Sequence, residues 1–360
     1  MNDDLDPFAA WAATEIGRGA MPGAAWWVGT AEGPLAHGCR GDAAVEPVRD
    51  PLSIDTPFDL ASLTKPLVTA LLATIFDREG RLSLDAPLGS VFRDLASSPF
   101  AAATLRDAAA HRAGFPAWVP LGMEGTTRGQ YLMRIAACER QGAPGETLYS
   151  DLGYILLGFA LEDAAEASLD ALFDRRVAAP LALRRCGFPG RGTAFSDAAA
   201  TERGGYYERE LAGDAARPER FRAVIRRGEV HDGNCWSLGG VAGHAGLFAP
   251  AAEVAACAVA LLAPQRLGLS RGAFDPMFRT VLDRPGARTI GFLKAADTES
   301  VGGLLPDDAV GHSGFTGTSV WIDARRPRVY VLLTNRVHPT VPPQPFTATR
   351  RAFHALAAAL

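Results

Sequence analysis

The sequence predicts an α+β fold: an antiparallel sheet flanked by helices, with an inserted, mainly helical lobe. Runs rich in β-branched and aromatic residues lie near both ends of the chain, at 24–30 and 319–334. Between them, alanine-rich segments alternate with glycine and proline, as in helices joined by loops. We expect a single domain over the whole chain, with an α/β lobe from 1–86 and 301–360 and a helical lobe from 87–300.

The N-terminal elements follow from local patterns. Residues 8–19 carry apolar side chains at helical spacing, and Pro22-Gly23 interrupts that pattern. Residues 24–30 then predict a strand, and Leu35 to Cys39 predicts a second strand after a turn. This segment is therefore a helix followed by a β-hairpin.

The C-terminal elements mirror this arrangement. Residues 319–323 and 329–334 predict two strands joined by a hairpin turn. Residues 347–360 predict a closing amphipathic helix, whose inward face we take to be Ala348, Phe353, Leu356 and Leu360. The simplest packing brings both hairpins into one sheet between the first and last helices.

Composition excludes several classes of function. The net charge is −4 without a basic block, which argues against a nucleic-acid partner. No apolar run reaches the ~18 residues that a membrane span needs. The acidic N-terminus lacks the pattern of a signal peptide, so a cytoplasmic protein is expected; a chain trimmed of its leader would look the same.

Cysteine usage indicates free thiols in a reducing compartment. The five cysteines are odd in number and widely spread, and no C-x-x-C pair occurs: they are Cys39, Cys138, Cys186, Cys235 and Cys257. His231, Cys235 and His244 could be read as zinc ligands, but their spacing fits no established metal pattern. We expect no metal.

A glycine-dense stretch, Gly239 to Gly246, could be mistaken for a phosphate-binding loop. It lacks both the Lys-Ser/Thr end of a Walker motif and the G-x-G-x-x-G order. Glycines that let the backbone pass close to another segment are the better explanation.

The chemistry is predicted to centre on Ser62 and Lys65. An apolar pattern from 63 to 75 predicts a helix that begins near Ser62, with Pro66 tolerated in its first turn. Residues three apart lie on one helical face, so the hydroxyl lies beside the amine, as a nucleophile beside its base. The alternative is an N-capping serine and a solvated lysine.

Two later segments could complete a site. Tyr149-Ser150-Asp151 opens an apolar helix, and His312-Ser313-Gly314-Phe315 precedes the strand at 319. Taken alone, the tyrosine would be a half-buried packing residue and the second segment a polar turn.

Together the three segments give S-x-x-K, Y-x-[ND] and [KH]-[ST]-G in that order: Ser62 to Lys65, Tyr149 to Asp151 and His312 to Gly314. This resembles the serine β-lactamase and penicillin-binding protein superfamily, in its branch of class C β-lactamases, D-Ala-D-Ala carboxypeptidases and esterases. The resemblance covers roughly residues 15 to 355. It implies a β-lactamase/transpeptidase-like fold and catalysis without a cofactor.

The resemblance also implies roles. Ser62 forms an acyl-enzyme, Tyr149 takes the proton or relays it to the leaving group and later activates water, and the N–H groups of Ser62 and Phe315 bind the oxyanion. A free lysine, with a pKa of about 10.4, is rarely neutral at pH 7. Lys65 can therefore act as the base only if burial or a neighbouring cation depresses its pKa; a Lys–Tyr pair that shares a proton is the alternative.

Two residues depart from the usual pattern. His312 replaces a lysine, which weakens the attraction for a substrate carboxylate and favours a neutral ester or amide; Ser313 and Gly314 complete that substrate-binding motif. Asp151 replaces an asparagine and could repel anions, hold Lys65 protonated or orient it. An alignment that begins at Ser150 is less suitable, because Leu152 would replace an asparagine.

The predicted function is a serine hydrolase that cleaves a small ester, amide or peptide through acyl-Ser62, with esterase activity favoured. The alternatives are β-lactamase or D-Ala-D-Ala carboxypeptidase/D-aminopeptidase activity, and a non-catalytic relative that binds peptides or cell-wall fragments. The sequence leaves the oligomeric state open.

Overall fold

The terminal hairpins form one antiparallel sheet, as predicted. The computed structural model describes residues 6–123, 125–143, 145–189, 195–213, 221–282, 286–342 and 344–360. In this part of the chain, seven strands pair in the order β3-β2-β1-β9-β8-β7-β6. They are β1 (Gly23–Thr30), β2 (Gly33–Ala44), β3 (Asp50–Pro51), β6 (Leu293–Lys294), β7 (Val310–Ser313), β8 (Ser319–Asp323) and β9 (Arg328–Thr334). Strand β1 pairs directly with β9, which joins the two ends of the chain.

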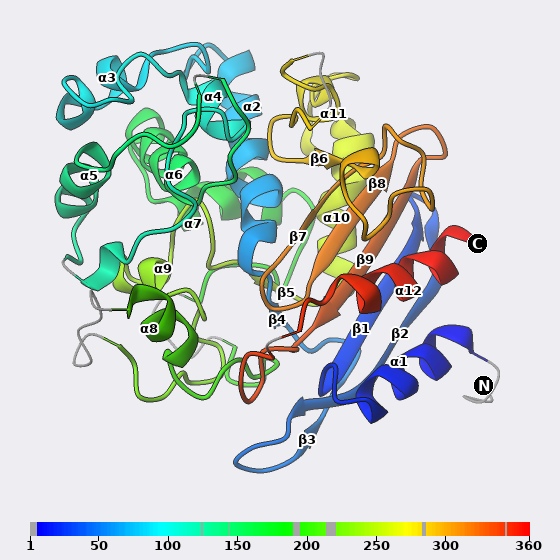
Figure 1. Ribbon diagram of the computed structural model, residues 1–360. Helices are drawn as coiled ribbons and strands as arrows, with labels where there is room; N and C mark the ends of the chain where they lie inside the picture. Colours follow the sequence, from blue (N-terminus) through cyan, green and yellow to red (C-terminus); the bar gives the residue numbers. More distant parts are fainter. Residues whose placement is uncertain are drawn as a thin grey trace.

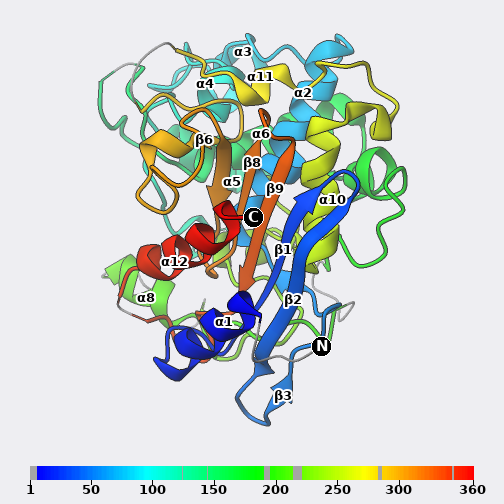
Figure 2. The ribbon, with the colours of Figure 1, turned by 90° about the vertical axis from the view of Figure 1, so that its right-hand side faces the viewer.

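Helices cover both faces of this sheet (Figures 1 and 2). Helices α1 (Pro7–Gly17) and α12 (Thr347–Ala358) lie on one face, and α10 (Ala251–Leu262) lies on the other. Successive strand residues point to opposite faces. Trp26 accordingly packs with Phe8 and Phe353, while Trp27 joins the larger core that includes α10. Successive side chains of β1 thus contribute to the two hydrophobic cores in turn.

A mainly helical region lies beside the sheet in Figure 1. Its helices are α2 (Leu71–Arg78), α3 (Leu88–Val91), α4 (Leu105–Ala109), α5 (Arg128–Ala136), α6 (Leu152–Ala165), α7 (Leu169–Phe173), α8 (Tyr206–Ala212), α9 (Gly233–Ser237) and α11 (Asp275–Phe278). A two-stranded sheet pairs β4 (Phe58–Asp59) with β5 (Phe248–Ala249). The division into lobes at residues 86 and 301 stays a proposal, and α10 belongs with the sheet on which it packs.

Three local predictions need correction. Residues 310–313 are a strand rather than a turn, because β8 provides hydrogen-bond partners along their length. The Ser62 helix begins as a 3₁₀ turn and continues as a π-helical stretch, Lys65–Ala70, before α2. Of the residues predicted to face inward near the C-terminus, Phe353 is buried and Leu356 half-buried, but Ala348 is exposed, and so is Leu360, which lies beyond the end of α12. The buried residues of α12 are Thr349, Arg350, Phe353, His354 and Ala357. The polar ones are buried because they find partners that the sequence pattern does not reveal.

The structure tests two predictions made from composition: that the cysteines are free thiols and that no segment is long and apolar enough to span a membrane. All five cysteines are free, three of them buried and two half-buried. Among the described residues, none of the helices combines the length and the apolarity needed to traverse a bilayer.

Buried His354 makes stability depend on pH. Its Nε2 lies 3.1 Å from Ser319 Oγ, and burial, assisted by Arg350, lowers its pKa from 6.5 to about 3. Below pH 6.5 the unfolded chain binds a proton at this residue that the folded chain rejects, so stability falls as pH falls. Between pH 7.5 and 5.5, protonation of this one histidine in the unfolded chain lowers the free energy of unfolding by about 1.4 kcal/mol.

Between pH 7.5 and 5.5, we therefore expect the free energy of unfolding to fall by about 1.4 kcal/mol less in His354→Gln than in the wild type, because glutamine does not titrate. Urea unfolding at pH 7.5 and 5.5 measures both differences, and other titrating groups cancel in the comparison. Equal pH dependence in the two proteins would show that His354 is not held neutral.

Candidate active site

The segment before Ser62 is held in a strained turn. Ala61 has φ 47°, in the left-handed region that an alanine adopts at a cost of about 1–2 kcal/mol. The buried Asp59 accepts hydrogen bonds from the backbone N–H of Ala61 at 2.9 Å and of His231 at 2.7 Å. Asp59 thus fixes the turn that presents Ser62.

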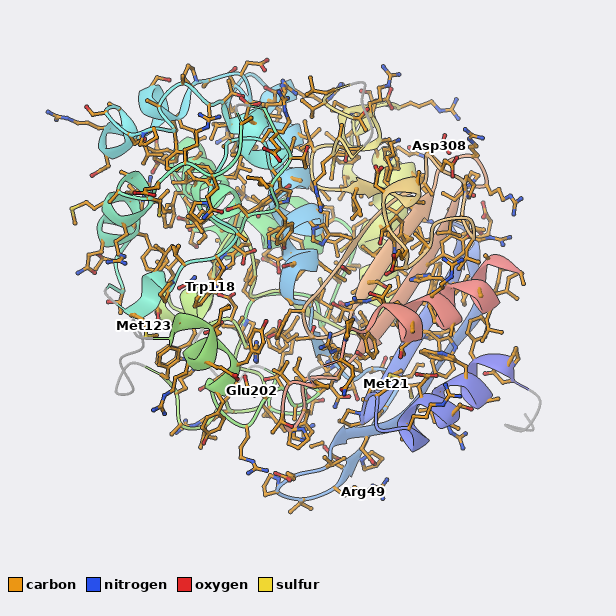
Figure 3. The ribbon with its side chains drawn as sticks, viewed as in Figure 1. Met21, Arg49, Trp118, Met123, Glu202 and Asp308 are labelled. Carbon is orange, nitrogen blue, oxygen red and sulfur yellow. The ribbon has the colours of Figure 1, made fainter. Side chains whose placement is uncertain are left out.

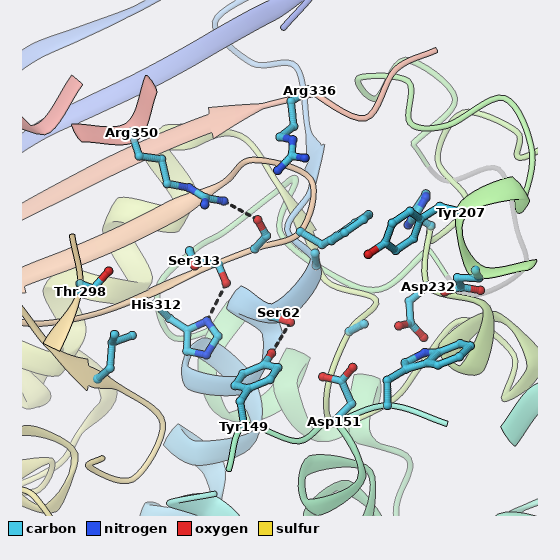
Figure 4. Close-up of a pocket in the computed structure, with 18 of the residues that line it drawn as sticks. Ser62, Tyr149, Asp151, Tyr207, Asp232, Thr298, His312, Ser313, Arg336 and Arg350 are labelled. Atoms are coloured by element: carbon cyan, nitrogen blue, oxygen red, sulfur yellow. Dashed lines mark hydrogen bonds between the residues drawn. The ribbon is translucent and has the colours of Figure 1, made fainter. Parts of the chain in front are cut away.

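The structure brings Ser62, Lys65 and Tyr149 together; Figure 4 shows the hydrogen bond between Ser62 and Tyr149. Ser62 Oγ accepts a hydrogen bond from Lys65 Nζ at 2.8 Å and another from Tyr149 Oη at 2.8 Å. Asp151 Oδ1 lies 2.6 Å from Lys65 Nζ. A hydroxyl, an amine, a phenol and a carboxylate therefore converge, and their catalytic roles remain predictions.

Lys65 is fully buried, and a glycine loop provides another of its partners. Its Nζ donates to the carbonyl oxygen of His244 at 3.2 Å. At the preceding Gly243, a Cβ would lie 2.0 Å from the carbonyl oxygen of Tyr154. Glycine here allows the close approach of two segments, as predicted for the 239–246 stretch, and so brings the His244 carbonyl to the amine.

The pKa of Lys65 moves in the direction opposite to the one a lysine base requires. Burial disfavours the ammonium, but the Asp151 carboxylate and Tyr149 outweigh it and raise the pKa of Lys65. Burial also raises the pKa of Tyr149, against the attraction of Lys65. The resting pair is an ammonium and a neutral phenol, so the condition under which Lys65 alone could act as the base is not met, and the proton-sharing pair is left as the alternative.

The loop after β7 is tied to the segment before Ser62. Thr316 Oγ1 donates to the Asp59 carbonyl at 2.8 Å, and Thr318 Oγ1 donates to the Leu60 carbonyl at 3.2 Å. At Gly314 a Cβ would lie 2.6 Å from the Leu60 carbonyl oxygen, so only glycine fits. These contacts hold the loop that carries Phe315 beside the turn that carries Ser62.

Arg350 supports the same loop from α12. Its Nη2 donates to the Gly314 carbonyl at 2.6 Å and to the Thr318 carbonyl at 3.3 Å. Sequence analysis missed this residue, because a charged side chain in an amphipathic helix is normally assigned to the solvent face.

His312 is neutral, with a defined tautomer. Its Nδ1 lies 2.8 Å from the Ser313 carbonyl oxygen, which can only accept, so Nδ1 carries the proton. Burial, with Arg288 and Lys65 nearby, keeps its pKa well below the usual value. Its Nε2 is buried without a hydrogen-bond partner among the described residues, and the ring lies 5.9 Å from that of Tyr149. His312 therefore presents an acceptor, not a cation, to the site.

Arg288 supplies a cation that the motifs do not predict. Its guanidinium carbon lies 5.4 Å from the centre of the Tyr149 ring, on the wall of the same cavity. Arginine stays charged in proteins. The loss of a lysine at position 312 therefore does not leave this part of the site without positive charge.

Ser62, Tyr149, Asp151, Arg288 and His312 line a cavity of about 640 Å³. Figure 4 shows His312 and Thr298 on one side of Ser62 and Tyr207 and Asp232 on the other. Trp118, labelled in Figure 3, also lines the cavity and lies near α8 and α9. The sequence motifs identify the centre of the cavity but not Trp118, Tyr207 or Asp232.

The wall near α8 and α9 carries buried acids. Glu208 accepts hydrogen bonds from the Gly233 N–H at 2.9 and 3.1 Å, and burial together with Asp232 raises its pKa to about 7. Asp232 caps α9 and lies 2.9 Å from His244 Nε2; burial opposes its charge, yet His244 holds its pKa below the usual value.

The three residues weighed as zinc ligands each have another partner. His231 Nε2 lies 2.9 Å from Glu202, His244 bonds to Asp232, and Cys235 Sγ donates to the Ala245 carbonyl at 3.2 Å. Within the described ranges, no group of three or more His, Cys, Asp or Glu residues is arranged to hold a metal.

Comparisons with known proteins agree with this geometry. The family model described as Beta-lactamase matches residues 8–354. A curated protein of Escherichia coli (strain K12), named "Putative D-alanyl-D-alanine carboxypeptidase", is 30% identical over 313 residues, which is 80% of this chain and 71% of the relative. The predicted resemblance is thereby confirmed.

Solved structures share the fold. EstCE1, described as a hydrolase with promiscuous acyltransferase activity, is similar with a TM-score of 0.72 and 20% identity, covering 96% of this chain and 97% of that one. A class C β-lactamase from Rhodobacter sphaeroides gives a TM-score of 0.69 and 18% identity, covering 97% of each chain. At these identities the likeness concerns the fold alone.

The Asp151–Lys65 ion pair generates a prediction on pH dependence. In the predicted roles, the Lys65–Tyr149 pair must lose one proton before Ser62 can attack, and the Asp151 charge opposes that loss. Asp151→Asn should therefore lower the pKa of the pair and move the acid limb of the kcat/KM profile to lower pH, by about 1–3 pH units. Rates of p-nitrophenyl ester hydrolysis from pH 5 to 10 measure the limb.

Asp163→Asn is the matched control, since this exposed carboxylate lies on the same helix α6 and pairs with Arg128. Its profile should coincide with that of the wild type. An acid limb that stays in place, or moves to higher pH, in Asp151→Asn would contradict the assigned electrostatics.

Proposed function

The chain belongs to the β-lactamase family, and on that premise we propose that it is a serine hydrolase that cleaves esters or amides through an acyl-Ser62 intermediate. The observation that carries the proposal is the contact of Ser62 Oγ with both Lys65 Nζ and Tyr149 Oη, inside a cavity large enough for a small substrate. The free cysteines support a reducing compartment for this activity.

The reaction begins with loss of one proton from the Lys65–Tyr149 pair. Because the Asp151 carboxylate stabilises the ammonium, the proton is lost more readily from Tyr149, whose phenolate would lie beside Lys65. Tyr149 then takes the Ser62 proton as Oγ attacks the carbonyl carbon. Lys65 acts by stabilising the phenolate and not by taking the proton itself.

The tetrahedral intermediate collapses when the bond to the leaving group breaks. Tyr149 returns the proton to the leaving oxygen or nitrogen, and His312 Nε2 can accept a hydrogen bond from that group. The N–H groups of Ser62 and Phe315 are the proposed oxyanion donors. In the second half, water gives a proton to Tyr149 as its oxygen attacks the acyl carbon. When the acyl–Oγ bond breaks, Tyr149 passes that proton to Ser62 Oγ and the carboxylic acid is released.

Esterase activity is the first choice, because neutral His312 removes the cation that would bind a substrate carboxylate at that position. Arg288 beside Tyr149 supports the second candidate, hydrolysis of carboxylate-bearing amides such as β-lactams or D-amino-acid peptides. Both reactions would use the same acyl-enzyme.

A fluorophosphonate probe and a small panel of esters, β-lactams and D-Ala-D-Ala peptides test the proposal. We expect one probe per wild-type chain, bound at Ser62, and an acyl-enzyme mass with at least one ester. Ser62→Ala should lose labelling and reduce hydrolysis by more than about 10³-fold, because no other group can form the covalent intermediate.

Ser83→Ala is the control, an exposed serine outside the cavity that should leave labelling unchanged. Absence of labelling and turnover in the wild type would favour a non-catalytic binding protein. Turnover that survives in Ser62→Ala would reject the acyl-serine mechanism.

A further inference from the structure

Arg336 is a cation without a counter-ion at the edge of the catalytic cavity. It follows β9, and its guanidinium carbon lies 5.9 Å from the ring of Phe315 and 5.3 Å from the ring of Phe346. Its Nε is buried without a hydrogen-bond partner, and no carboxylate pairs with it in the part of the chain that the structure describes. The aromatic rings orient the guanidinium but leave its donors free.

A second cavity, of about 620 Å³, adjoins the first at this residue. Arg336, Phe315, Tyr207 and Leu211 line both cavities. The rest of its lining is the apolar Val341, Pro342 and Pro345 together with the polar Glu210 and Gln344. A substrate chain that extends from the first cavity into the second passes Arg336 and Phe315, because both residues line both cavities.

This junction lies on the acyl side of Ser62. The leaving group must lie where Tyr149 can return a proton to it, which is the side of His312 and Thr298 in Figure 4. The acyl group then extends to the opposite side, where Tyr207 stands. The Tyr207 ring lies 4.8 Å from that of Phe315, and Phe315 in turn contacts Arg336.

The other charges around this junction do not neutralise Arg336. Arg350, its neighbour, is a second guanidinium, and its pKa falls to about 10 through burial and the repulsion of Arg336. Asp232 is occupied by His244 and by the α9 N-terminus, and Glu208 is bound to the Gly233 N–H with a pKa near 7. Glu210, which also lines the second cavity, is exposed to solvent, and among the described residues no ion pair joins it to Arg336. Arg336 therefore keeps a positive charge that no described carboxylate pairs with where the two cavities meet.

We propose that Arg336 binds a carboxylate on the acyl part of the substrate, so that half-esters or half-amides of dicarboxylic acids are preferred over neutral acyl groups of equal length. A guanidinium can bind a carboxylate through two parallel hydrogen bonds. The inference rests on the proposed acyl-Ser62 chemistry and makes Arg336 a specificity-determining residue.

The test compares p-nitrophenyl half-esters of adipic and suberic acid with the matched neutral hexanoate and octanoate esters, after subtraction of spontaneous hydrolysis. At one chain length, kcat/KM should favour the half-ester about tenfold. Arg336→Met should abolish that preference, mainly through KM, and Arg336→Lys should restore part of it. In both variants, kcat/KM for the neutral esters should change much less than kcat/KM for the half-esters, so the ratio of the two reports the carboxylate contact.

Arg326→Met is the matched control, since Arg326 is exposed in the β8–β9 hairpin and lies outside both cavities. It should retain the preference. Calorimetric binding of suberate to Ser62→Ala, with and without Arg336→Met, checks the same contact without turnover; binding should be lost in the double variant.

The inference is overturned if wild type shows no half-ester preference, if Arg336→Met retains it, or if suberate binds equally with and without Arg336. Preference for the cationic p-nitrophenyl 6-aminohexanoate, unchanged in Arg336→Met, would also overturn it and assign the acyl side to Glu208 and Asp232. In each case, continued hydrolysis of neutral esters through Ser62 leaves the proposed function intact, whereas loss of labelling at Ser62 rejects that function itself.

Discussion

The buried ammonium of Lys65 is the interaction on which the site depends. A lone charge with no exposed surface would be strongly destabilising, so the fold must surround it with partners. Those partners come from three separate parts of the chain: Ser62, Asp151 and the carbonyl of His244. Satisfying one cation therefore brings together the helix start, the entry to α6 and the glycine loop. The contacts that compensate the Lys65 charge also place its Nζ beside the hydroxyl of Ser62.

A second constraint connects the sheet to this centre. Asp59 and Leu60 receive hydrogen bonds through their backbone carbonyls from Thr316 and Thr318, while Arg350 binds the carbonyl of Gly314. The turn with Ser62 and the loop with Phe315 are thus anchored to each other and to α12. Backbone donors from these two segments can act on one oxyanion only if their separation is constant. Rigidity here comes from side-chain-to-backbone hydrogen bonds, which a hydrophobic pattern does not encode.

Sequence reasoning succeeded where short-range patterns carry the information. Alternation and hairpin signals located β1, β8 and β9, and spacing placed Lys65 beside Ser62. It failed where a residue's environment is set by distant segments. Arg288, Arg336 and Arg350 look like ordinary surface arginines in the sequence, and only the folded chain reveals which of them face the cavity. The direction in which the pKa of Lys65 shifts likewise depends on Asp151. From the sequence alone, Asp151 could repel anions, hold Lys65 protonated or orient it.

The distribution of charge changes how the third motif should be interpreted. Read alone, the replacement of lysine by His312 suggests a site without affinity for anions, and the burial that keeps His312 neutral supports that reading locally. The cavity nevertheless contains three arginines from outside the motifs, one beside Tyr149 and two near Phe315. Because Lys65 is compensated by Asp151, the charges that a substrate meets come mainly from these arginines and from the carboxylates on the wall near α8 and α9. On the proposed mechanism, substrate charge is set by residues that the motifs omit, with Arg288 near the leaving group and Arg336 near the acyl group.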